Sequence, residues 1–203
     1  MTLQETLDII RPADSEIYRQ AGEAWNRVAK PLGSLGIFEE DIQRIAAAQG
    51  TVTPSLDRCD LVVFCADNGV VEEGVTQTDA SVTTVVAKGL CDGRASVARM
   101  AEVADVRVHP VDIGARDDLS GLDLLHRKIA SGTRNLAREP AMSREEALQA
   151  IEIGIEIARD LASQGSHLLI TGEMGIGNTT TSSAVASVLL NQSPETMTGR
   201  GAG

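Results

Sequence analysis

A glycine-rich stretch late in the chain, TGEMGIGNTTTSS over residues 171–183, has the residue types of a phosphate-binding loop. Set against the pattern G-x-x-x-x-G-K-[ST], it supplies Gly172, Gly177 and Thr179, but Asn178 stands where the lysine belongs. A lysine and Mg²⁺ serve the outer phosphates of a nucleoside triphosphate, whereas backbone N–H groups and hydroxyls alone can hold a monoester. The stretch therefore favours a monophosphate.

The alternative for this stretch is a tight strand-to-helix turn whose helix is capped by threonine or serine. Three glycines within six residues, Gly172, Gly175 and Gly177, weigh against it because a bare turn seldom needs so many. A strand, a glycine-rich turn and a helix N-terminus together present N–H groups and a positive dipole end to an anion. Three side chains would add donors: Asn178, Thr179 and Thr180.

Glu173 lies inside the same stretch and has the wrong charge to bind an anion. In a dry pocket beside the phosphate, a carboxylate can act as a general base, or can accept a hydrogen bond from a ribose hydroxyl or an azole N–H. The alternative is a solvated glutamate at the start of a helix. Both interpretations stay open at this point.

Two further loops place an aspartate directly after an apolar run. DNGVVEEGVTQT begins with Asp67, and DIGARDD begins with Asp112. Ligands of open α/β sheets bind at the carboxyl ends of the strands, so both carboxylates could face one crevice with Glu173. Either aspartate could instead cap its own turn. The final stretch TGRGAG, residues 198–203, would bring a second set of backbone donors together with Arg200.

The apolar runs that precede these loops predict a parallel sheet. LVVFCA (residues 61–66) and VRVHPVDIGA (106–115) are β-branched and end in turn residues, and HLLI (167–170) leads into the glycine-rich stretch. VTTVVAKGL and RASVARMAEVA between the first two are helical candidates. The order strand, helix, strand predicts a parallel pair with a right-handed crossover. TTSSAVASVLL is expected to form the helix after the glycine-rich stretch.

SREEALQAIEIGIEIARDLASQG is the clearest helix in the sequence. Ser143 and Glu146 form a capping box, and Gly165 is a C-terminal stop. One apolar stripe is expected to face the sheet: Leu148, Ile151, Ile155, Ala158 and Ala162. The first fifty residues also predict helices, at LQETLDII, SEIYRQAGEAWNRVAK and FEEDIQRIAAAQ, which would make a small helical layer.

The composition fits a folded α/β protein. Of 203 residues, 42% are hydrophobic and 23% charged, and only four are aromatic, so the core must be aliphatic, as in buried parallel sheets. A formal net charge of −11 and the lack of a basic stripe argue against nucleic acid as a partner. No apolar run approaches the roughly 20 residues of a membrane span, and the start has no signal-peptide pattern. We expect a cytoplasmic protein with no membrane contact.

No metal or cofactor is expected from the ligand-type residues. Cys59, Cys65 and Cys91 lack C-x-x-C spacing, and the three histidines form no H-x-x-x-H pair. Cys65 sits in an apolar run, where it should act as a small hydrophobe. TGRGAG ends the sequence without a following element, although such loops normally connect a strand to a helix, and we therefore expect a fragment.

Seven segments, in this order along the chain, resemble one enzyme family. They are KPLGSLG, ADNGVVEEGVTQT, PVDIGA, RKIASGTRN, EPAMSREEA, GEMGIGNTTTSSAV and TGRGAG. Together they look like the nicotinate-nucleotide:dimethylbenzimidazole phosphoribosyltransferases of cobalamin biosynthesis, over about Lys30 to Gly203. GEMGIGNTT is the most specific of them.

The resemblance implies a transferase that moves the phosphoribosyl group of nicotinate mononucleotide to 5,6-dimethylbenzimidazole, giving α-ribazole 5′-phosphate and nicotinate. It also implies a Rossmann-like parallel sheet with covering helices, a small helical domain and a homodimer. Residues 1–50 would be the helical layer, and residues 51–203 a phosphoribosyl-binding domain incomplete at its C-terminus. The phosphate and ribose would contact Gly175, Ile176, Gly177, Asn178, Thr179, Thr180, Gly199, Arg200 and Gly201. The base pocket would include Asp67, Gln77, Ser81 and Met174.

The family's usual catalytic base lies in a region beyond this sequence, so Glu173 is the candidate catalytic residue here and the chain could be inactive alone. Two other function classes remain open on sequence. One is a non-catalytic module that binds a nucleoside monophosphate, and the other is a degenerate P-loop-like nucleoside triphosphatase.

Overall fold

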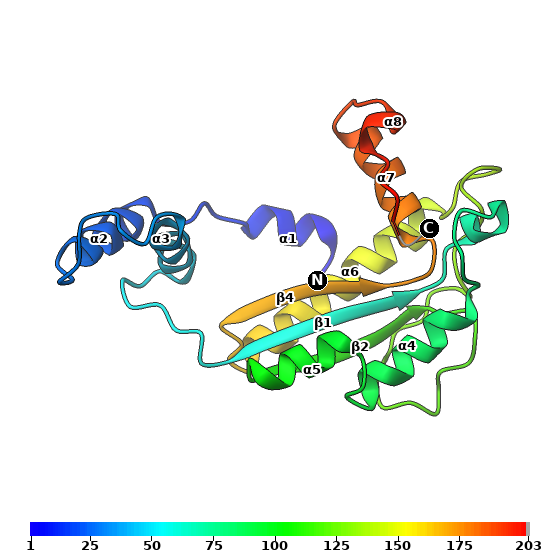
Figure 1. Cartoon of the computed structure of the whole chain (residues 1–203), viewed down its shortest axis with the longest axis horizontal. Helices are drawn as coiled ribbons and strands as arrows, with labels where there is room; N and C mark the ends of the chain where they lie inside the picture. Colours follow the sequence, from blue (N-terminus) through cyan, green and yellow to red (C-terminus); the bar gives the residue numbers. More distant parts are fainter. Residues whose placement is uncertain (202–203) are drawn as a thin grey trace.

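A parallel four-stranded sheet with helices on both faces forms the body of the molecule in the computed structural model, which describes residues 1–201 (Figure 1). The strands are β1 (Cys59–Ala66), β2 (Val106–Gly114), β3 (Leu125–His126) and β4 (Leu168–Met174). They lie in the order β3-β2-β1-β4, and each neighbouring pair is parallel. The predicted α/β class and the three predicted strands are confirmed.

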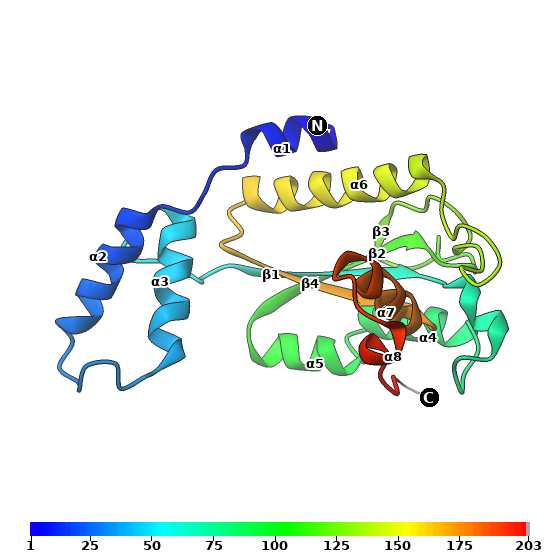
Figure 2. The same cartoon turned by 90° about the horizontal axis from the view of Figure 1, so that it is seen from above.

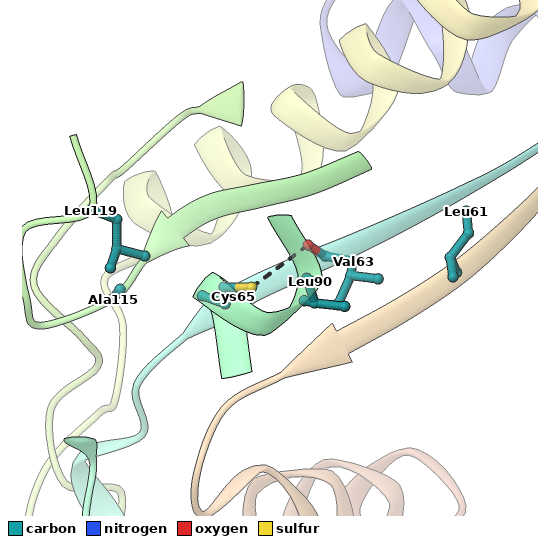
Figure 3. Close-up of a cluster of buried hydrophobic side chains, with 7 residues drawn as sticks. Leu61, Val63, Cys65, Leu90, Ala115 and Leu119 are labelled. Carbon is teal, nitrogen blue, oxygen red and sulfur yellow. Dashed lines mark hydrogen bonds between the residues drawn. The ribbon is translucent and has the colours of Figure 1, made fainter. Parts of the chain in front are cut away.

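Strand β1 is the centre of the sheet and is apolar on both faces. Leu61, Val63 and Cys65 pack on one side, and Val62 packs on the other. Figure 3 shows the first cluster, in which the Cys65 thiol donates to the Val63 carbonyl oxygen at 3.8 Å. Burial raises the pKa of the Cys65 thiol to about 12, so the thiol stays neutral and packs as the small hydrophobe predicted.

The two faces of the sheet carry different helices (Figure 2). Helices α4 (Ser81–Cys91) and α5 (Ser96–Val103) cover one face, and α6 (Arg144–Ser163) covers the other. The α6 capping box is present, since the Ser143 side chain accepts from the Glu146 N–H and the Glu146 carboxylate accepts from the Ser143 N–H. Gly165, with φ +88°, follows the last turn as predicted.

The predicted apolar stripe of α6 was wrong. The side chains that pack on the sheet are Ile157 and Leu161, with Ile153 beside them, whereas Ile151 is 45% exposed. Ile155 faces a groove between α6 and the N-terminal helix. Isoleucines stand at every second position from 151 to 157, so helical periodicity offered two stripes and could not decide between them.

The first fifty residues form the three predicted helices, α1 (Leu3–Ile9), α2 (Ser15–Asn26) and α3 (Ile37–Gln49). Helix α1 lies along α6, while α2 and α3 pack side by side as a hairpin that stands away from the sheet (Figures 1 and 2). The turn of the hairpin is held by Glu39, which pairs with Lys30 at 2.7 Å and accepts from the Leu35 N–H at 3.0 Å. The division at residue 50 into two domains stays a prediction.

Three short elements were not predicted. The 3-10 helix η1 (Gly69–Glu73) follows β1, the two-residue strand β3 pairs with the end of β2, and α8 (Pro194–Met197) follows α7 (Asn178–Leu189). Each is shorter than the window over which hydrophobic periodicity can be measured.

Large apolar side chains remain exposed around the outer side of β4, which is an edge strand among the described residues. Ile170 of β4 and Met100 of α5 border a groove of about 410 Å³. Beyond it, Val188 and Leu189 of α7 are 81% and 77% exposed. Exposed apolar side chains therefore occur both in this groove and on α7.

Truncation of a leucine to alanine should lower the free energy of unfolding more in the core than on the surface. Leu119 is 1% exposed and packs in the cluster around Cys65, so Leu119→Ala should lower the free energy of unfolding by about 2 to 5 kcal/mol. The matched change Leu189→Ala, at a side chain 77% exposed, should alter it by no more than about 0.5 kcal/mol. Urea unfolding followed by circular dichroism measures both, and equal effects would contradict this assignment of the core.

Candidate functional site

Three loops meet at the carboxyl end of the sheet. They follow β1, β2 and β4, and because the strands are parallel their ends lie at the same edge. The loop after β4 is short: it runs from Gly175 to Gly177 and leads directly into α7 at Asn178. This arrangement of strand, glycine-rich turn and helix N-terminus was predicted from the stretch over residues 171–183.

The glycines of this loop are required by close packing. A Cβ atom on Gly175 would lie 1.9 Å from the Ala66 carbonyl oxygen, which no side chain can tolerate. Gly177 has φ +86°, and a Cβ there would lie 2.9 Å from a methyl group of Val71. The two positions thus need glycine to lay the loop on the end of β1, whether or not a phosphate binds.

The peptide groups of Ile176 are fixed from outside the loop. Its N–H donates to the Thr83 hydroxyl at 3.2 Å, and its carbonyl accepts from the Asn68 amide at 3.2 Å. Thr83 is fully buried in α4, and the Asn68 amide also accepts from the Thr181 hydroxyl at 2.9 Å. None of these residues was predicted from the sequence as part of the site. The polar Thr83 at a buried position of an apolar helix was a usable signal, whereas Asn68 in an Asp-Asn-Gly stretch was interpreted only as a turn.

Asn178, at the lysine position, turns back onto the protein. Its side-chain Nδ2 donates to the Glu173 carboxylate at 2.6 Å, and its side-chain Oδ1 accepts from the Thr179 N–H at 2.9 Å. Its own N–H donates to the Gly175 carbonyl at 3.0 Å. In residues 1–201, the backbone N–H of Thr180 makes no hydrogen bond, so it is available at the positive end of the α7 dipole.

The second glycine-rich segment touches the first. A Cβ on Gly201 would lie 2.7 Å from the Thr179 hydroxyl oxygen, so the backbone there lies directly against the first turn of α7. Gly199 and Arg200 are exposed in the same segment. The remainder of the predicted TGRGAG loop, residues 202–203, lies outside the described residues. Sequence reasoning placed the two segments at one site, and the structure places them in contact.

Glu173 does not lie in the loop as expected. It belongs to β4, in register with Phe64, and its side chain is exposed. The strand extends four residues beyond the predicted run HLLI because Thr171 to Met174 pair with β1 up to Cys65. The dry pocket expected around this carboxylate is not formed by the described residues, since β4 is their edge strand.

The predicted base-pocket residues are placed differently from one another. Asp67 is 1% exposed and accepts from the Arg116 N–H at 2.7 Å, which is a bond to the loop after β2. Met174 is half-buried and packs against the core cluster, while Gln77 and Ser81 are exposed ahead of and at the start of α4. The base pocket stays a prediction.

Asp112 follows the capping alternative. It is 3% exposed and accepts from the Ala115 N–H at 2.9 Å within its own turn, with the Lys128 ammonium 3.6 Å away. Its carboxylate therefore supports the loop after β2, and the expected joint crevice with Glu173 is not formed.

The GTRN segment, residues 132–135, holds the loop after β1 in place. The Thr133 hydroxyl accepts from the Gly69 N–H at 3.1 Å, and the Thr133 N–H donates to the Asp67 carbonyl at 2.9 Å. Asn135 is 6% exposed and donates to the Glu73 carboxylate at 2.6 Å. This segment therefore holds both ends of η1 in place.

Residues 1–201 contain no group of three or more histidine, cysteine, aspartate or glutamate side chains arranged to hold a metal ion. In the same part of the chain, no helix is both long enough and apolar enough to cross a membrane.

The comparisons with known proteins cover the residues described above. A protein-family model described as "Phosphoribosyltransferase" matches residues 10–203. The chain belongs to this phosphoribosyltransferase family. It is similar to proteins named nicotinate-nucleotide--dimethylbenzimidazole phosphoribosyltransferase, with 43% identity to one from Ruminiclostridium cellulolyticum over 100% of this chain and 58% of the relative. One from Acetivibrio thermocellus is 44% identical over 93% of this chain and 55% of the relative.

The family fold is also found in solved structures. CobT from Thermus thermophilus superposes with a TM-score of 0.88 at 42% identity, over 93% of this chain and 57% of that chain. The chain therefore spans a little over half the length of the relatives that it matches.

The ion pair between Arg134 and Glu146 beside the site, at 2.8 Å, predicts that the free energy of unfolding depends on pH. The Arg134 guanidinium and the Ser143 N–H hold the pKa of Glu146 below its usual value of 4.5. The folded chain thus binds this proton less readily than the unfolded chain, so the stabilisation is complete above that usual value and is lost as the pH falls through the lowered pKa. Urea unfolding from about pH 7 to about pH 3 should show the advantage of the wild type over Glu146→Gln shrinking with acid.

Glu145→Gln, at the exposed neighbouring position, is the matched control for that series. Its difference from the wild type should change much less over the same pH range. A Glu146→Gln difference that stays constant with pH would contradict the role assigned to the Arg134 pair.

Proposed function

We propose that this chain binds nicotinate mononucleotide and 5,6-dimethylbenzimidazole as part of a phosphoribosyltransferase that yields α-ribazole 5′-phosphate and nicotinate. The observation that carries the proposal is the loop from Gly175 to Thr180 in a chain of this family, with Asn178 bonded to Glu173 in place of a lysine directed at a phosphate. A loop of N–H groups and hydroxyls at a helix N-terminus suits a monoester. The names of the relatives supply the substrates.

The chemistry fits such a loop. The donor has one phosphate, and its leaving group is a pyridinium that departs with a neutral ring, so no pyrophosphate charge has to be neutralised. The bond from C1′ to the nicotinate nitrogen breaks as a benzimidazole nitrogen forms the new bond from the opposite face. The ribosyl configuration inverts from β to α, and the proton on the other benzimidazole nitrogen passes to a base.

Glu173 is the candidate residue of this chain for receiving that proton. It lies on β4 beside the loop, and the Asn178 amide holds one of its carboxylate oxygens at 2.6 Å. This hydrogen bond joins the carboxylate to the first turn of α7, where the phosphate would bind. Glu173 would therefore keep a fixed position relative to the donor.

The remaining expectations stand as parts of the same proposal. These are a homodimeric state, a cytoplasmic location, and the division into a helical layer over residues 1–50 and a phosphoribosyl-binding part over 51–203. The triphosphatase alternative lacks support because no lysine stands in the loop.

The phosphate loop predicts a position-specific charge effect. Thr180→Asp would set a carboxylate beside the free N–H in the first turn of α7, so the affinity for nicotinate mononucleotide should fall at least about tenfold. Ser182→Asp adds the same charge two residues along, on the opposite face of the helix, and should leave affinity nearly unchanged. Isothermal titration calorimetry measures both, and equal affinities for the two variants would remove α7 from the site.

The reaction itself is tested by turnover. Incubation of the chain with nicotinate mononucleotide and 5,6-dimethylbenzimidazole should yield α-ribazole 5′-phosphate, detected by liquid chromatography and mass spectrometry. If the 203-residue chain gives none, a chain extended to the length of its relatives must give product, or the proposed function fails.

In whichever of these chains is active, Glu173→Gln should lower kcat by about a hundredfold or more, the usual loss for a general base, with little change in donor affinity. Glu195→Gln, at an exposed carboxylate of α8, is the control and should retain turnover. Wild-type kcat in Glu173→Gln would remove Glu173 from the reaction.

A further inference from the structure

The peptide that shapes the phosphate loop is held by side chains from two other segments. Ile176 donates its N–H to Thr83 of α4 and accepts from Asn68 of the loop after β1, both at 3.2 Å. Because both sides of this residue are bonded, rotation of its peptide groups would break a hydrogen bond. These two hydrogen bonds therefore fix the orientation of the backbone N–H groups that follow Ile176 at the start of α7.

Asn68 makes a second contact on the same loop. Its amide oxygen accepts from the Thr181 hydroxyl at 2.9 Å, so one side chain joins the turn to the first turn of α7. Asn68 is separated from Ile176 by 108 residues and from Thr181 by 113. At the start of η1 an asparagine commonly caps its own helix, but this one makes no capping hydrogen bond. Its side chain is directed across the sheet edge instead.

The Asn68 contact has a consequence for the donor groups of α7. Gly177 is the N-cap of α7, so the Thr180 N–H is one of the first-turn donors that have no partner within the helix. Only a helix that began one residue earlier would pair this N–H with the Ile176 carbonyl. That carbonyl accepts from Asn68 instead, and in residues 1–201 the Thr180 N–H makes no hydrogen bond. Among residues 1–201, the Thr180 N–H is therefore a first-turn donor that has no partner in its own helix.

We propose that Asn68 is a positioning residue for the phosphate of the donor substrate. It touches neither substrate nor reacting atoms, and acts through the Ile176 carbonyl and the Thr181 hydroxyl to hold the loop open to an anion at Thr180. This inference rests on the proposed function, since it assigns the geometry of the same site.

Asn68 can do this because it stands on a rigid base. Gly69 next to it donates to the Thr133 hydroxyl at 3.1 Å, and a Cβ on Gly69 would lie 2.5 Å from the Arg134 backbone. The backbone at Asn68 is therefore packed against the GTRN segment on one side, while its side chain reaches the phosphate loop on the other.

The test separates positioning from general stability with a matched pair of variants. Asn68→Ala removes both contacts to the phosphate loop, whereas Asn135→Ala removes the bond to Glu73 at the other end of η1 and touches no residue of that loop. Affinity for nicotinate mononucleotide should fall about tenfold in Asn68→Ala, the effect of roughly 1.4 kcal/mol, and should stay within about twofold of wild type in Asn135→Ala. Melting temperature is recorded for both.

Thr181 supplies a second, milder pair. Thr181→Ser keeps the hydroxyl that donates to Asn68 and should keep wild-type affinity, whereas Thr181→Val keeps the shape and should lose about threefold to tenfold. This pair decides the question if Asn68→Ala does not fold. Equal affinity in the two Thr181 variants, or equal losses in Asn68→Ala and Asn135→Ala, would overturn the positioning role.

Hydrogen exchange without ligand distinguishes this inference from the proposed function. Backbone amides over residues 176–181 should exchange faster in Asn68→Ala than in Asn135→Ala. Failure of the wild-type chain, at its full family length, to bind nicotinate mononucleotide would defeat the proposed function. Unchanged exchange over the loop in Asn68→Ala would instead defeat the role of Asn68.

Discussion

The candidate site depends on one close approach between two backbones. The loop after β4 crosses the end of β1 with Gly175 directly over the Ala66 carbonyl oxygen, where a Cβ would lie only 1.9 Å away. The parallel pairing of β1 and β4 up to Cys65 and Met174 brings the two chain segments to this point. With any larger residue the loop would have to move outward, and the Asn68 amide would then lose the Ile176 carbonyl.

Charge plays a smaller part at this edge than hydrogen bonding does. The two aspartates that are buried at this edge, Asp67 and Asp112, both accept backbone N–H groups of the loop after β2, so they stabilise the scaffold. The proposed anion site would consist of hydroxyls and the N-terminus of α7, and the dipole at such a helix end is equivalent to about half a unit charge. In a chain with a formal net charge of −11, such a site favours a ligand with few charges. This agrees with the proposal that the ligand carries a single phosphate.

The sequence predicted those parts of the fold that repeat a pattern over several residues. The three long strands, the capping box at Ser143 and the glycine-rich turn before α7 all have local causes, and all were found. The face of α6 was misassigned because isoleucines alternate along it, so only the packing partners Val62 and Val111 select Ile157. Glu173 was misplaced because the length of β4 is set by its pairing with β1.

The contacts that shape the candidate site could not be predicted in the same way. Asn68 and Thr181 are 113 residues apart, and nothing local in either segment specifies the other. Asp-Asn-Gly is a common turn signal, and that local interpretation fits whether the asparagine caps its own turn or reaches another loop. Only the strand order, with β4 beside β1, brings the two segments together.

The central position of β1 also sets the order in which the chain can fold during synthesis. Strand β2, the partner of β1 on one side, is made early, whereas β4, the partner on the other side, is made just before the segment that contacts Asn68. That segment follows Asn68 by 108 residues, which at 5–20 residues per second is a delay of roughly 5 to 20 s. Through that interval a strand with apolar side chains on both faces has one unpaired edge. The nascent chain therefore presents an aggregation-prone segment for seconds, and shielding by the ribosome surface or by a chaperone would matter most before residues 168–174 emerge.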